Sequence, residues 1–415
     1  MMARCGGGSR QRIRRRSRPQ RGDVAATSEL TRPDGDLPAP HIGLNLLYLV
    51  PGETGGTETY ARELIPELVA AAPELRFTAF INREAAEAGG GPWGELIPAV
   101  VIPIRARTRP EWVRGEQQLL PVSARRRGVH LVHSLANTAP VWGAYARTVT
   151  IHDLLHRIAP EAHLGMLSHG MRLLVTAAAR RSARVIVDAE STRADLRRLL
   201  GIDPRRVDVV PLGLGARRGP AAPEAEVRAM LAEPARRIVL SVSALRPHKN
   251  LVRLIEAVGL IDPERRPLIV IVGYPTDHEA ELHERIGALG LRDDVRVLGW
   301  VPSETLEGLY AISDAFVFPS LYEGFGLPVL EAMARGVPVA CSGQGSLREV
   351  AGDATLIFDP RSRSEIARAI ERLLEGGPEV ERLRTAGRDR ASRFTWGQTA
   401  RGTIASYRRS MDGSV

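Results

Sequence analysis

Several residue types are scarce in this sequence, and each shortage argues against a class of protein. Only two of the 415 residues are cysteine, Cys5 and Cys341, and no CxxC spacing occurs, so a disulfide framework is not expected. No apolar run approaches the ~18 residues that a membrane-spanning helix needs. The arginine-rich start is followed by polar residues, where a secretion signal would need an apolar segment. We therefore expect a cytoplasmic protein.

Lysine is the scarcest charged residue. Of 57 basic side chains a single one, Lys249, is lysine, and all others are arginine. An ammonium group and a guanidinium group are not interchangeable, because they differ in shape, hydration and hydrogen-bonding geometry. Lys249 therefore marks a position where an ammonium group is required, with chance as the alternative explanation.

The positive charge is unevenly distributed. The formal net charge is +9, but residues 1–40 hold nine arginines against four acidic residues, so the remainder is only mildly basic. Residues 1–38 contain almost nothing to bury and are expected to form a disordered Arg-rich tail. An inert tail and an arm that contacts anionic lipid or nucleic acid are the alternatives. The remainder lacks interleaved basic and aromatic residues, so no nucleic-acid partner is expected.

From residue 39 onward, short apolar runs rich in β-branched residues alternate with longer helical patterns. Hydrophobic residues make up 44% of the chain, enough for a sizeable core, and the length suggests two to three domains. Alternation of strands and helices predicts parallel sheets flanked by helices, because parallel strands need crossover connections. Seven such runs precede residue 215, and six follow residue 235.

The spacing of these runs predicts the domain organisation. We expect an N-terminal Rossmann-like domain over 39–215, a linker with a short helix over 216–234, and a C-terminal Rossmann-like domain over 235–390. Residues 391–415 are predicted to form a C-terminal helix that packs back toward the N-terminal domain, with Thr395 and Gln398 in a capping-box pattern. The predicted fold class is α/β, with two doubly wound domains facing a central cleft.

The most informative segment is 314–341, DAFVFPSLYEGFGLPVLEAMARGVPVAC. A buried strand is followed by a loop that ends at Gly324-Phe325-Gly326, and Pro328 suits the first turn of the next helix. Free N–H groups and the positive end of the helix dipole can hold a phosphate at such a turn. Glu323 and Glu331 lie on either side of the turn and could both reach a ligand there. The alternative is that they only stabilise the helix dipole.

The pattern E-G-F-G-L-P-x-L-E-A-M-A-x-G-x-P-V resembles the E-x7-E signature of glycosyltransferase family 4, a large retaining family with the two-domain GT-B architecture. The resemblance implies an enzyme that transfers a hexose from a nucleotide-diphosphate sugar. It places Glu323 beside the transferred sugar and Glu331 on the ribose hydroxyls. The donor's sugar and diphosphate would be held by the loop that contains Gly324 and by the amides of Phe325, Gly326 and Leu327.

A second predicted anion site lies in SVSALRPHKNL, after the first strand of the second domain. Arg246 and Lys249 converge there on a helix start, for which Asn250 is a plausible N-cap. By resemblance, the two cations neutralise the leaving diphosphate. The alternative is a solvated charged loop.

The first domain offers further candidates. Gly55 and Gly56 lie between the first strand and a helix, and by resemblance their loop approaches the donor phosphates; Glu58 could equally be a dipole partner of that helix. His152 ends a strand at the carboxyl edge, where ligand-binding residues belong. The resemblance implies that it contacts the donor sugar, although a lone histidine is more often structural. Val301 resembles part of the wall around the nucleotide base.

The resemblance also implies a reaction scheme. Glu323, His152, Arg246 and Lys249 form the expected catalytic set. No DxD motif follows a core strand, and two cations can perform a metal's task, so neither metal nor cofactor is expected. Retention is expected through front-face attack, with the leaving phosphate accepting the proton, rather than through a nucleophilic Glu323.

The donor and acceptor are less closely specified. The segments IHDLLH and YEGFGLP are most similar to those of bacterial mannosyltransferases, so GDP-mannose is the favoured donor. UDP-glucose and UDP-N-acetylglucosamine are alternatives, as are a GT-B nucleotide-sugar 2-epimerase and a non-catalytic nucleotide-sugar-binding relative. The acceptor is expected to be a hydroxyl of a glycan, a lipid-linked sugar or a small molecule.

A basic segment in the first domain raises the question of a membrane surface. Residues 105–127 contain seven arginines together with Trp112 and two leucines. Such a composition is typical of a peripheral contact with an anionic membrane at its inner face. A solvated basic helix is the alternative.

Overall fold

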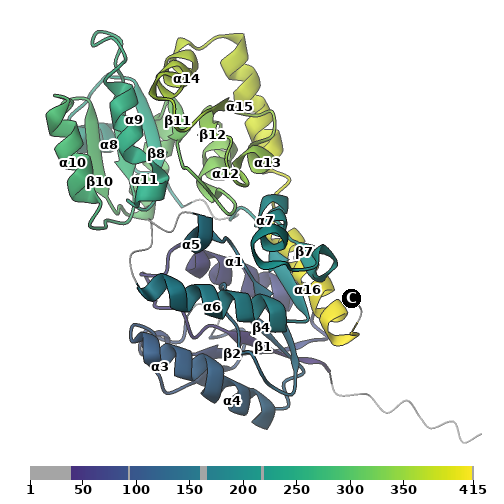
Figure 1. Cartoon of the computed structure of the whole chain (residues 1–415). Coiled ribbons are helices and arrows are strands. Elements are labelled where there is room, and N and C mark those ends of the chain that lie inside the picture. The colour runs from purple at the N-terminus through teal and green to yellow at the C-terminus, as the bar shows by residue number, and fades with distance from the viewer. Residues whose placement is uncertain (1–38, 92–93, 159–165, 216–218, 414–415) are drawn as a thin grey trace, which may run out of the picture. The chain divides into compact units, whose positions relative to one another are not determined.

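A computed structural model describes residues 39–91, 94–158, 166–215 and 219–413. The predicted tail (1–38) and the start of the predicted linker (216–218) lie outside these residues. The described part of the chain forms two parallel sheets, with strand orders β3-β2-β1-β4-β5-β6-β7 and β10-β9-β8-β11-β12-β13 (Figure 1). Two parallel sheets with helices between their strands confirm the predicted fold class.

The first sheet is built from the apolar runs before residue 215. Its strands are β1 (His41–Asn45), β2 (Arg76–Ile81), β3 (Ala99–Val101), β4 (Leu131–Ser134), β5 (Ala146–Thr150), β6 (Arg184–Val187) and β7 (Val207–Val209). The helices of this half are α1 (Gly56–Ala71), α2 (Arg83–Glu87), α3 (Arg109–Arg114), the π-helix η1 (Gly115–Leu119), α4 (Leu120–Arg126), α5 (Leu155–Ile158), α6 (Met166–Arg181), α7 (Glu190–Leu200) and the 3-10 helix η3 (Pro204–Arg206).

The second sheet repeats the pattern. Its strands are β8 (Ile238–Val242), β9 (Leu268–Val272), β10 (Val295–Gly299), β11 (Ala315–Phe318), β12 (Val339–Ser342) and β13 (Leu356–Phe358). The helices after residue 219 are α8 (Glu224–Leu231), the 3-10 helix η4 (Pro247–Lys249), α9 (Leu251–Val258), α10 (Glu279–Ala288), α11 (Ser303–Ile312), α12 (Leu327–Ala334), α13 (Leu347–Ala351), α14 (Arg363–Glu375), α15 (Pro378–Ala391) and α16 (Trp396–Met411). Among the described residues, none of the helices is both long and apolar enough to span a bilayer.

Each sheet is covered by helices on both faces, as buried parallel sheets require. In β11, Phe316 and Phe318 belong to an apolar cluster with α12, whereas Ala315 and Val317 belong to another with α9 and α14. The first sheet packs against α1 and α16 on one face, and against α4, α6 and α7 on the other. The cluster on the α12 face continues through Trp396 to the α1 face of the first sheet. A single apolar cluster therefore joins the two halves.

The helix α9 shows how the sequence specifies this packing. Its apolar residues Leu251, Leu254, Ile255 and Val258 recur at the spacing of one helix face, and all four are fully buried. Truncating one such leucine to alanine typically costs ~2–5 kcal/mol, because a cavity remains. This face anchors the loop just before α9, which carries Arg246 and Lys249.

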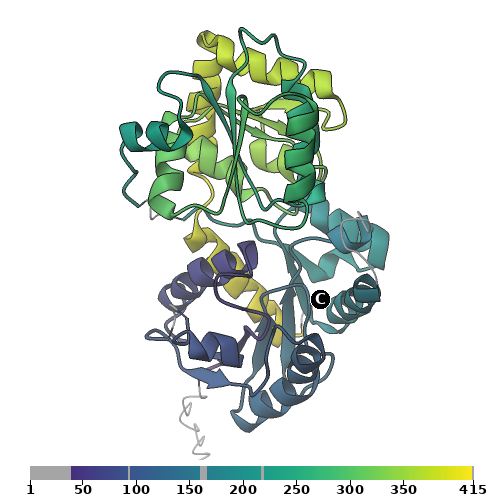
Figure 2. The same cartoon turned by 90° about the vertical axis from the view of Figure 1, so that its left-hand side faces the viewer.

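The last helix, α16, packs on the first sheet although it follows the whole second sheet in sequence. It lies beside α1, as Figure 1 and Figure 2 both show. Its Tyr407 hydroxyl lies 2.7 Å from Nδ1 of His133 in β4, and its Ser410 hydroxyl lies 2.8 Å from that of Thr148 in β5. The side chain of Thr395 caps the helix by accepting a hydrogen bond from the Gln398 amide, as the capping-box pattern predicts.

Two chain segments run side by side where the halves are connected. The amide of Leu214 donates to the carbonyl of Phe394 at 3.0 Å, and Leu214 forms an isolated parallel bridge with Thr395. A Cβ at Gly213 would lie 2.1 Å from the amide nitrogen of Trp396, so only glycine fits there. The two segments that connect the halves, around Leu214 and around Thr395, are therefore held against each other.

Candidate functional site

The turn between β11 and α12 forms an open cradle of backbone N–H groups. Gly326 is the N-cap of α12 with φ 106°, a conformation that favours glycine, and Pro328 occupies the first turn, as the sequence predicts. Among the described residues, no acceptor is found for the amides of Phe325, Gly326 and Leu327. Free N–H groups at the positive end of a helix dipole suit an anionic ligand.

Lys249 and Glu323 meet directly in front of this turn. The Lys249 Nζ lies 2.6 Å from the Glu323 Oε1, and both side chains are largely buried, with 15% and 13% of their surfaces exposed. The ammonium group also lies 5.4 Å from the centre of the Phe318 ring. Charges this far from water need a partner, which gives the only lysine of the chain a defined place. Sequence reasoning named both residues without predicting that they would pair.

Arg246 lies at the start of the same loop and is exposed. Among the described residues its side chain has no hydrogen-bonding or ion-pair partner, so its guanidinium group is free to meet a ligand. The 3-10 turn η4 connects it to Lys249, whose amide donates to the Arg246 carbonyl at 2.9 Å. This hydrogen bond holds the backbone between Arg246 and Lys249 in a single turn.

Asn250 occupies the N-cap position of α9, as predicted, but it does not cap the helix with its side chain. That side chain makes no cap hydrogen bond, and the φ of Asn250 is 60°. Its Nδ2 instead donates to the carbonyls of Pro319, at 3.0 Å, and Pro360, at 2.8 Å. Bonding to distant carbonyls outcompetes the local cap because the side chain is buried between them. Asn250 thereby holds the loop that carries Arg246 and Lys249 against the end of β11.

Glu331 lies on α12 and is oriented by Tyr310 of α11. The Tyr310 hydroxyl donates to the Glu331 Oε2 at 3.2 Å. Arg335 pairs with Glu307 and stacks over the Tyr310 ring at 4.4 Å. Burial raises the pKa of Glu331 despite the attraction of Arg335 and the hydrogen bond from Tyr310. The carboxyl group is thus fixed in orientation, with one oxygen available for a ligand hydroxyl.

His152 follows β5 at the carboxyl edge of the first sheet, as predicted. Its Nδ1 lies 2.7 Å from the Asp188 Oδ2, and its Nε2 lies 2.9 Å from the carbonyl oxygen of Leu135. Its amide donates to the Asn137 Oδ1 at 2.9 Å. Burial works against the charged ring, but the Asp188 carboxylate, the Leu135 carbonyl and the Asp153 carboxylate together outweigh it, and the pKa of His152 is raised.

The loop of the second half touches His152. A Cβ at Gly324 would lie 2.0 Å from the His152 carbonyl oxygen and 3.1 Å from the Asp153 Cβ, so the two backbones are in close contact. Nearby, the Tyr322 hydroxyl donates to the Asp195 Oδ2 of α7 at 2.7 Å. The structure therefore brings His152 and Gly324 together with Glu323 and Lys249, although Gly324 lies 172 positions after His152 in the sequence.

The remaining predicted residues are not linked to this cluster by contacts among the described residues. Gly55 is the N-cap of α1 with φ 65°, and open space surrounds both Gly55 and Gly56. Glu58 is engaged within its own loop, accepting from the Gly52 amide at 2.8 Å and pairing with Arg62 at 2.6 Å. Val301 is partly buried just after β10.

Sequence reasoning missed two residues that orient this site, Asp188 and Tyr310. Asp188 directly follows β6, so the rule that selected His152 at a carboxyl strand edge could have found it. Tyr310 lies within a helix, and no sequence signal connects it to Glu331, which is 21 residues away.

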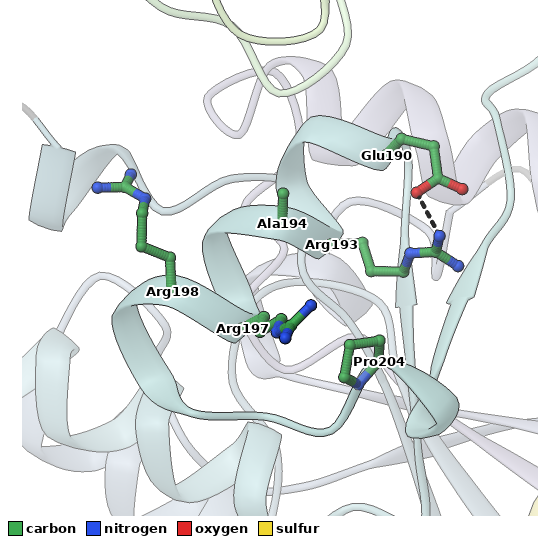
Figure 3. A pocket seen from close by; sticks show the side chains of 6 residues that line it. All are labelled: Glu190, Arg193, Ala194, Arg197, Arg198 and Pro204. Atoms are coloured by element: carbon green, nitrogen blue, oxygen red, sulfur yellow. Dashed lines mark ion pairs between the residues drawn. The ribbon is translucent and has the colours of Figure 1, made fainter.

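A separate pocket on α7 is rich in arginine. It has a volume of about 420 Å³ and is lined by Glu190, Arg193, Ala194, Arg197, Arg198 and Pro204 (Figure 3). Arg193 pairs with Glu190 at 2.7 Å and Arg198 with Asp195 at 2.6 Å, so much of its charge is already balanced. Within the described ranges, no group of three or more His, Cys, Asp or Glu side chains could hold a metal ion.

Comparisons with protein families agree with this architecture. A model described as "Glycosyltransferase Family 4" matches residues 54–218, and one described as "Glycosyl transferases group 1" matches residues 224–390. The Anabaena protein HepE, solved with UDP and glucose, superposes with a TM-score of 0.70 at 22% identity, covering 89% of this chain and all of that one. Sucrose-phosphate synthase from Thermosynechococcus elongatus also gives a TM-score of 0.70, at 23% identity over 90% of this chain and all of that one. These similarities establish the GT-B fold.

Three relatives that are similar in sequence show the family to which the chain belongs. The O-antigen chain mannosyltransferase B of Escherichia coli is 33% identical over 268 residues, which are 62% of this chain and 69% of the relative. The MMP alpha-(1->4)-mannosyltransferase of Mycolicibacterium hassiacum is 30% identical over 237 residues, which are 56% of each chain. A D-inositol 3-phosphate glycosyltransferase of Kineococcus radiotolerans is 31% identical over 72% of this chain and 70% of the relative. The chain therefore belongs to glycosyltransferase family 4 and is a glycosyltransferase.

Proposed function

We propose that this glycosyltransferase moves a hexosyl residue, with mannose favoured, from a nucleotide-diphosphate sugar to an acceptor hydroxyl with retention of anomeric configuration. The Lys249–Glu323 pair at 2.6 Å, in front of the free amides of α12, is the observation that carries the proposal. It combines a cation for the leaving diphosphate with a carboxylate for the sugar at one point.

The leaving group is the centre of this mechanism. Negative charge develops on the diphosphate as the glycosidic bond breaks, and fixed positive groups stabilise it most where water is excluded. An ammonium group has three donors, so Lys249 can keep Glu323 and still donate to a phosphate oxygen. Arg246 supplies a second cation, and the amides of 325–327 add neutral donors. These groups would perform the metal's task, and we propose a metal-independent reaction.

The geometry around Glu323 favours front-face attack. A double displacement needs a free carboxylate nucleophile on one face of the sugar. Glu323 is held by Lys249, and its backbone carbonyl accepts from the Ser346 amide at 3.2 Å and from the Ser346 hydroxyl at 3.1 Å. A carboxylate fixed in this way suits positioning of the sugar. The leaving phosphate would then take the proton of the acceptor hydroxyl.

Glu331 and the names of two relatives support the proposed donor. Glu331, with one carboxylate oxygen on Tyr310, would accept hydrogen bonds from the ribose hydroxyls. The names of two relatives support a mannosyl donor, and GDP-mannose is the donor we propose. UDP-glucose and UDP-N-acetylglucosamine are the alternatives to test against it.

Nucleotide release from a panel of GDP-, UDP- and ADP-sugars tests the proposal. We expect slow hydrolysis of GDP-mannose by the wild type and its loss in Glu323→Ala. Arg253→Ala is a suitable control, because Arg253 is on α9 and its side chain donates to the Arg361 carbonyl, with no ion pair among the described residues. Release from a UDP-sugar alone would replace the donor assignment. Failure to bind any nucleotide sugar in calorimetry would overturn the proposal.

The predicted contact with an anionic membrane remains a proposal for residues 105–127. Arg105 pairs with Glu87 and Arg107 with Glu53, which neutralises part of the segment. Arg126, at the end of α4, is exposed. Replacing Arg126 and Arg127 by glutamate should weaken co-sedimentation with anionic liposomes, and unchanged co-sedimentation would contradict this contact.

A further inference from the structure

The imidazole ring of His152 is held between two hydrogen-bond acceptors. The Asp188 carboxyl group faces Nδ1 at 2.7 Å, and the Leu135 carbonyl faces Nε2 at 2.9 Å. A carbonyl oxygen can only accept, so Nε2 must carry a proton. The bond between Nδ1 and the carboxyl group needs a second proton. Two protons are therefore shared among His152 Nε2, His152 Nδ1 and the Asp188 Oδ2. When Asp188 is ionised, both protons are on the ring, which is then an imidazolium.

The groups around the ring single out Asp188 as its electrostatic partner. Asp153, the next residue in the chain, also favours the charged ring, but its contribution is smaller. His133 of β4 is fully buried, which lowers its pKa to about 3 and keeps it neutral. Tyr60 of α1 meets the ring edge-on at 4.8 Å, and burial raises its pKa, so it is neutral too. Burial raises the pKa of Asp188, and the attraction of the His152 ring opposes that rise. Asp188 is the group that contacts the ring and, when ionised, carries the opposing charge.

We infer that Asp188 is a positioning residue of the transferase reaction: it holds Nδ1 of His152 and keeps the ring protonated, so that the Nε2–H, which faces the Leu135 carbonyl, is the one ring N–H left to share with a hydroxyl of the donor sugar. The inference rests on the proposed function, which places the sugar beside Glu323. The contact of Gly324 with the His152 carbonyl sets the backbone of His152 beside that loop. His152 then acts as a hydrogen-bond donor and never as a base.

This role has a definite pH dependence. The pKa of His152 is raised, so the ring keeps both protons below that pKa and loses one as the pH rises through it. Donor turnover should therefore fall on the alkaline side. Removing the Asp188 charge takes away the largest interaction that favours the imidazolium, so the fall should begin at lower pH.

The variant Asp188→Asn tests the inference against a matched control. Asn keeps the size of the side chain but lacks the charge. We expect turnover at neutral pH to fall at least tenfold, KM for the donor to change less, and the alkaline limb of the pH–rate profile to move to lower pH. Asp208→Asn is the control, because Asp208 lies on β7 of the same sheet and pairs with Arg184 and Arg409. It should leave the shape of the profile unchanged.

Two further measurements separate positioning from general destabilisation. In a His152→Gln background, adding Asp188→Asn should cost little further turnover, since the partner through which it acts is gone. Proton NMR titration should show a lower pKa for His152 in Asp188→Asn than in the wild type. An unchanged His152 titration, or a profile that differs only in height, would overturn the inference. The titration needs no turnover, so it decides the point even if the proposed donor reaction fails.

Discussion

The two halves of this enzyme handle their polar groups at the carboxyl edges of their sheets in different ways. In the second half, the amides of 325–327 and the guanidinium group of Arg246 have no protein partner among the described residues. In the first half, His152 is held at both ring nitrogens, and Glu58 is engaged within its own loop. One half presents open donors, and the other presents groups whose orientation is already fixed.

Glu116 is the strongest example of the closed arrangement. It lies in the π-helix η1 and is only 2% exposed. Its carboxyl group accepts from Asn45 at 2.9 Å, Thr138 at 2.9 Å and Gln117 at 3.0 Å. Satisfied buried networks of this kind rigidify their surroundings. The comparison therefore suggests that the second half binds the leaving group, whereas the first half presents an orienting surface.

Lys249→Ala should produce the largest effect, because it removes a cation from the open half. Loss of one group that stabilises developing charge typically costs about 10²–10³-fold in turnover. It also leaves Glu323 without its partner at 2.6 Å. Nucleotide release under saturating donor measures the effect. A variant within threefold of the wild type would show that the leaving group is stabilised elsewhere.

Gly324→Ala tests the point where the halves meet. An added Cβ would lie 2.0 Å from the His152 carbonyl oxygen, so the two loops must separate. We expect turnover to fall by about tenfold or more, since small misplacements are costly in catalysis. Nucleotide binding by calorimetry should change little. Gly170→Ala on α6 adds a methyl group into open space and is the control. Equal turnover in both variants would argue against this contact.

Glu116→Gln should have the smallest effect on turnover and a clear effect on stability. Burial raises the pKa of Glu116 to about 7 from 4.5, the ordinary value for a glutamate. Between these values the folded state holds a proton that the unfolded state has released, so stability falls as the pH rises toward and through 7. Glutamine removes this dependence, worth on the order of 3 kcal/mol at most. Urea unfolding of both proteins at pH 5 and pH 8 should show the variant gaining relative stability, and parallel values would contradict it.

Most of the fold could be predicted from the sequence, because local patterns specify it. β-branched runs bounded by turn residues marked the strands of both sheets, and a buried face at helical spacing marked α9. The loop at 323–331 was recognisable for the same reason: glycine, proline and glutamate each have a local role at a strand-to-helix turn.

Partners across the chain were not predictable in the same way. Asn250 was expected to cap α9, but its side chain binds carbonyls that lie 69 and 110 residues away in the sequence. The pairing of Lys249 with Glu323 and that of His152 with Asp188 likewise depend on which strand ends adjoin. Local patterns carry no information about such distances, so both pairs became visible only in the folded chain.

The position of α16 has a consequence for how the protein is made. The first sheet receives Tyr407 and Ser410 from a helix that the ribosome synthesises after the whole of the second sheet. The face of the first sheet that α16 covers therefore stays incomplete until the second sheet and the helices up to α15 have been synthesised. Loss of α16 would thus expose part of the half that was synthesised first.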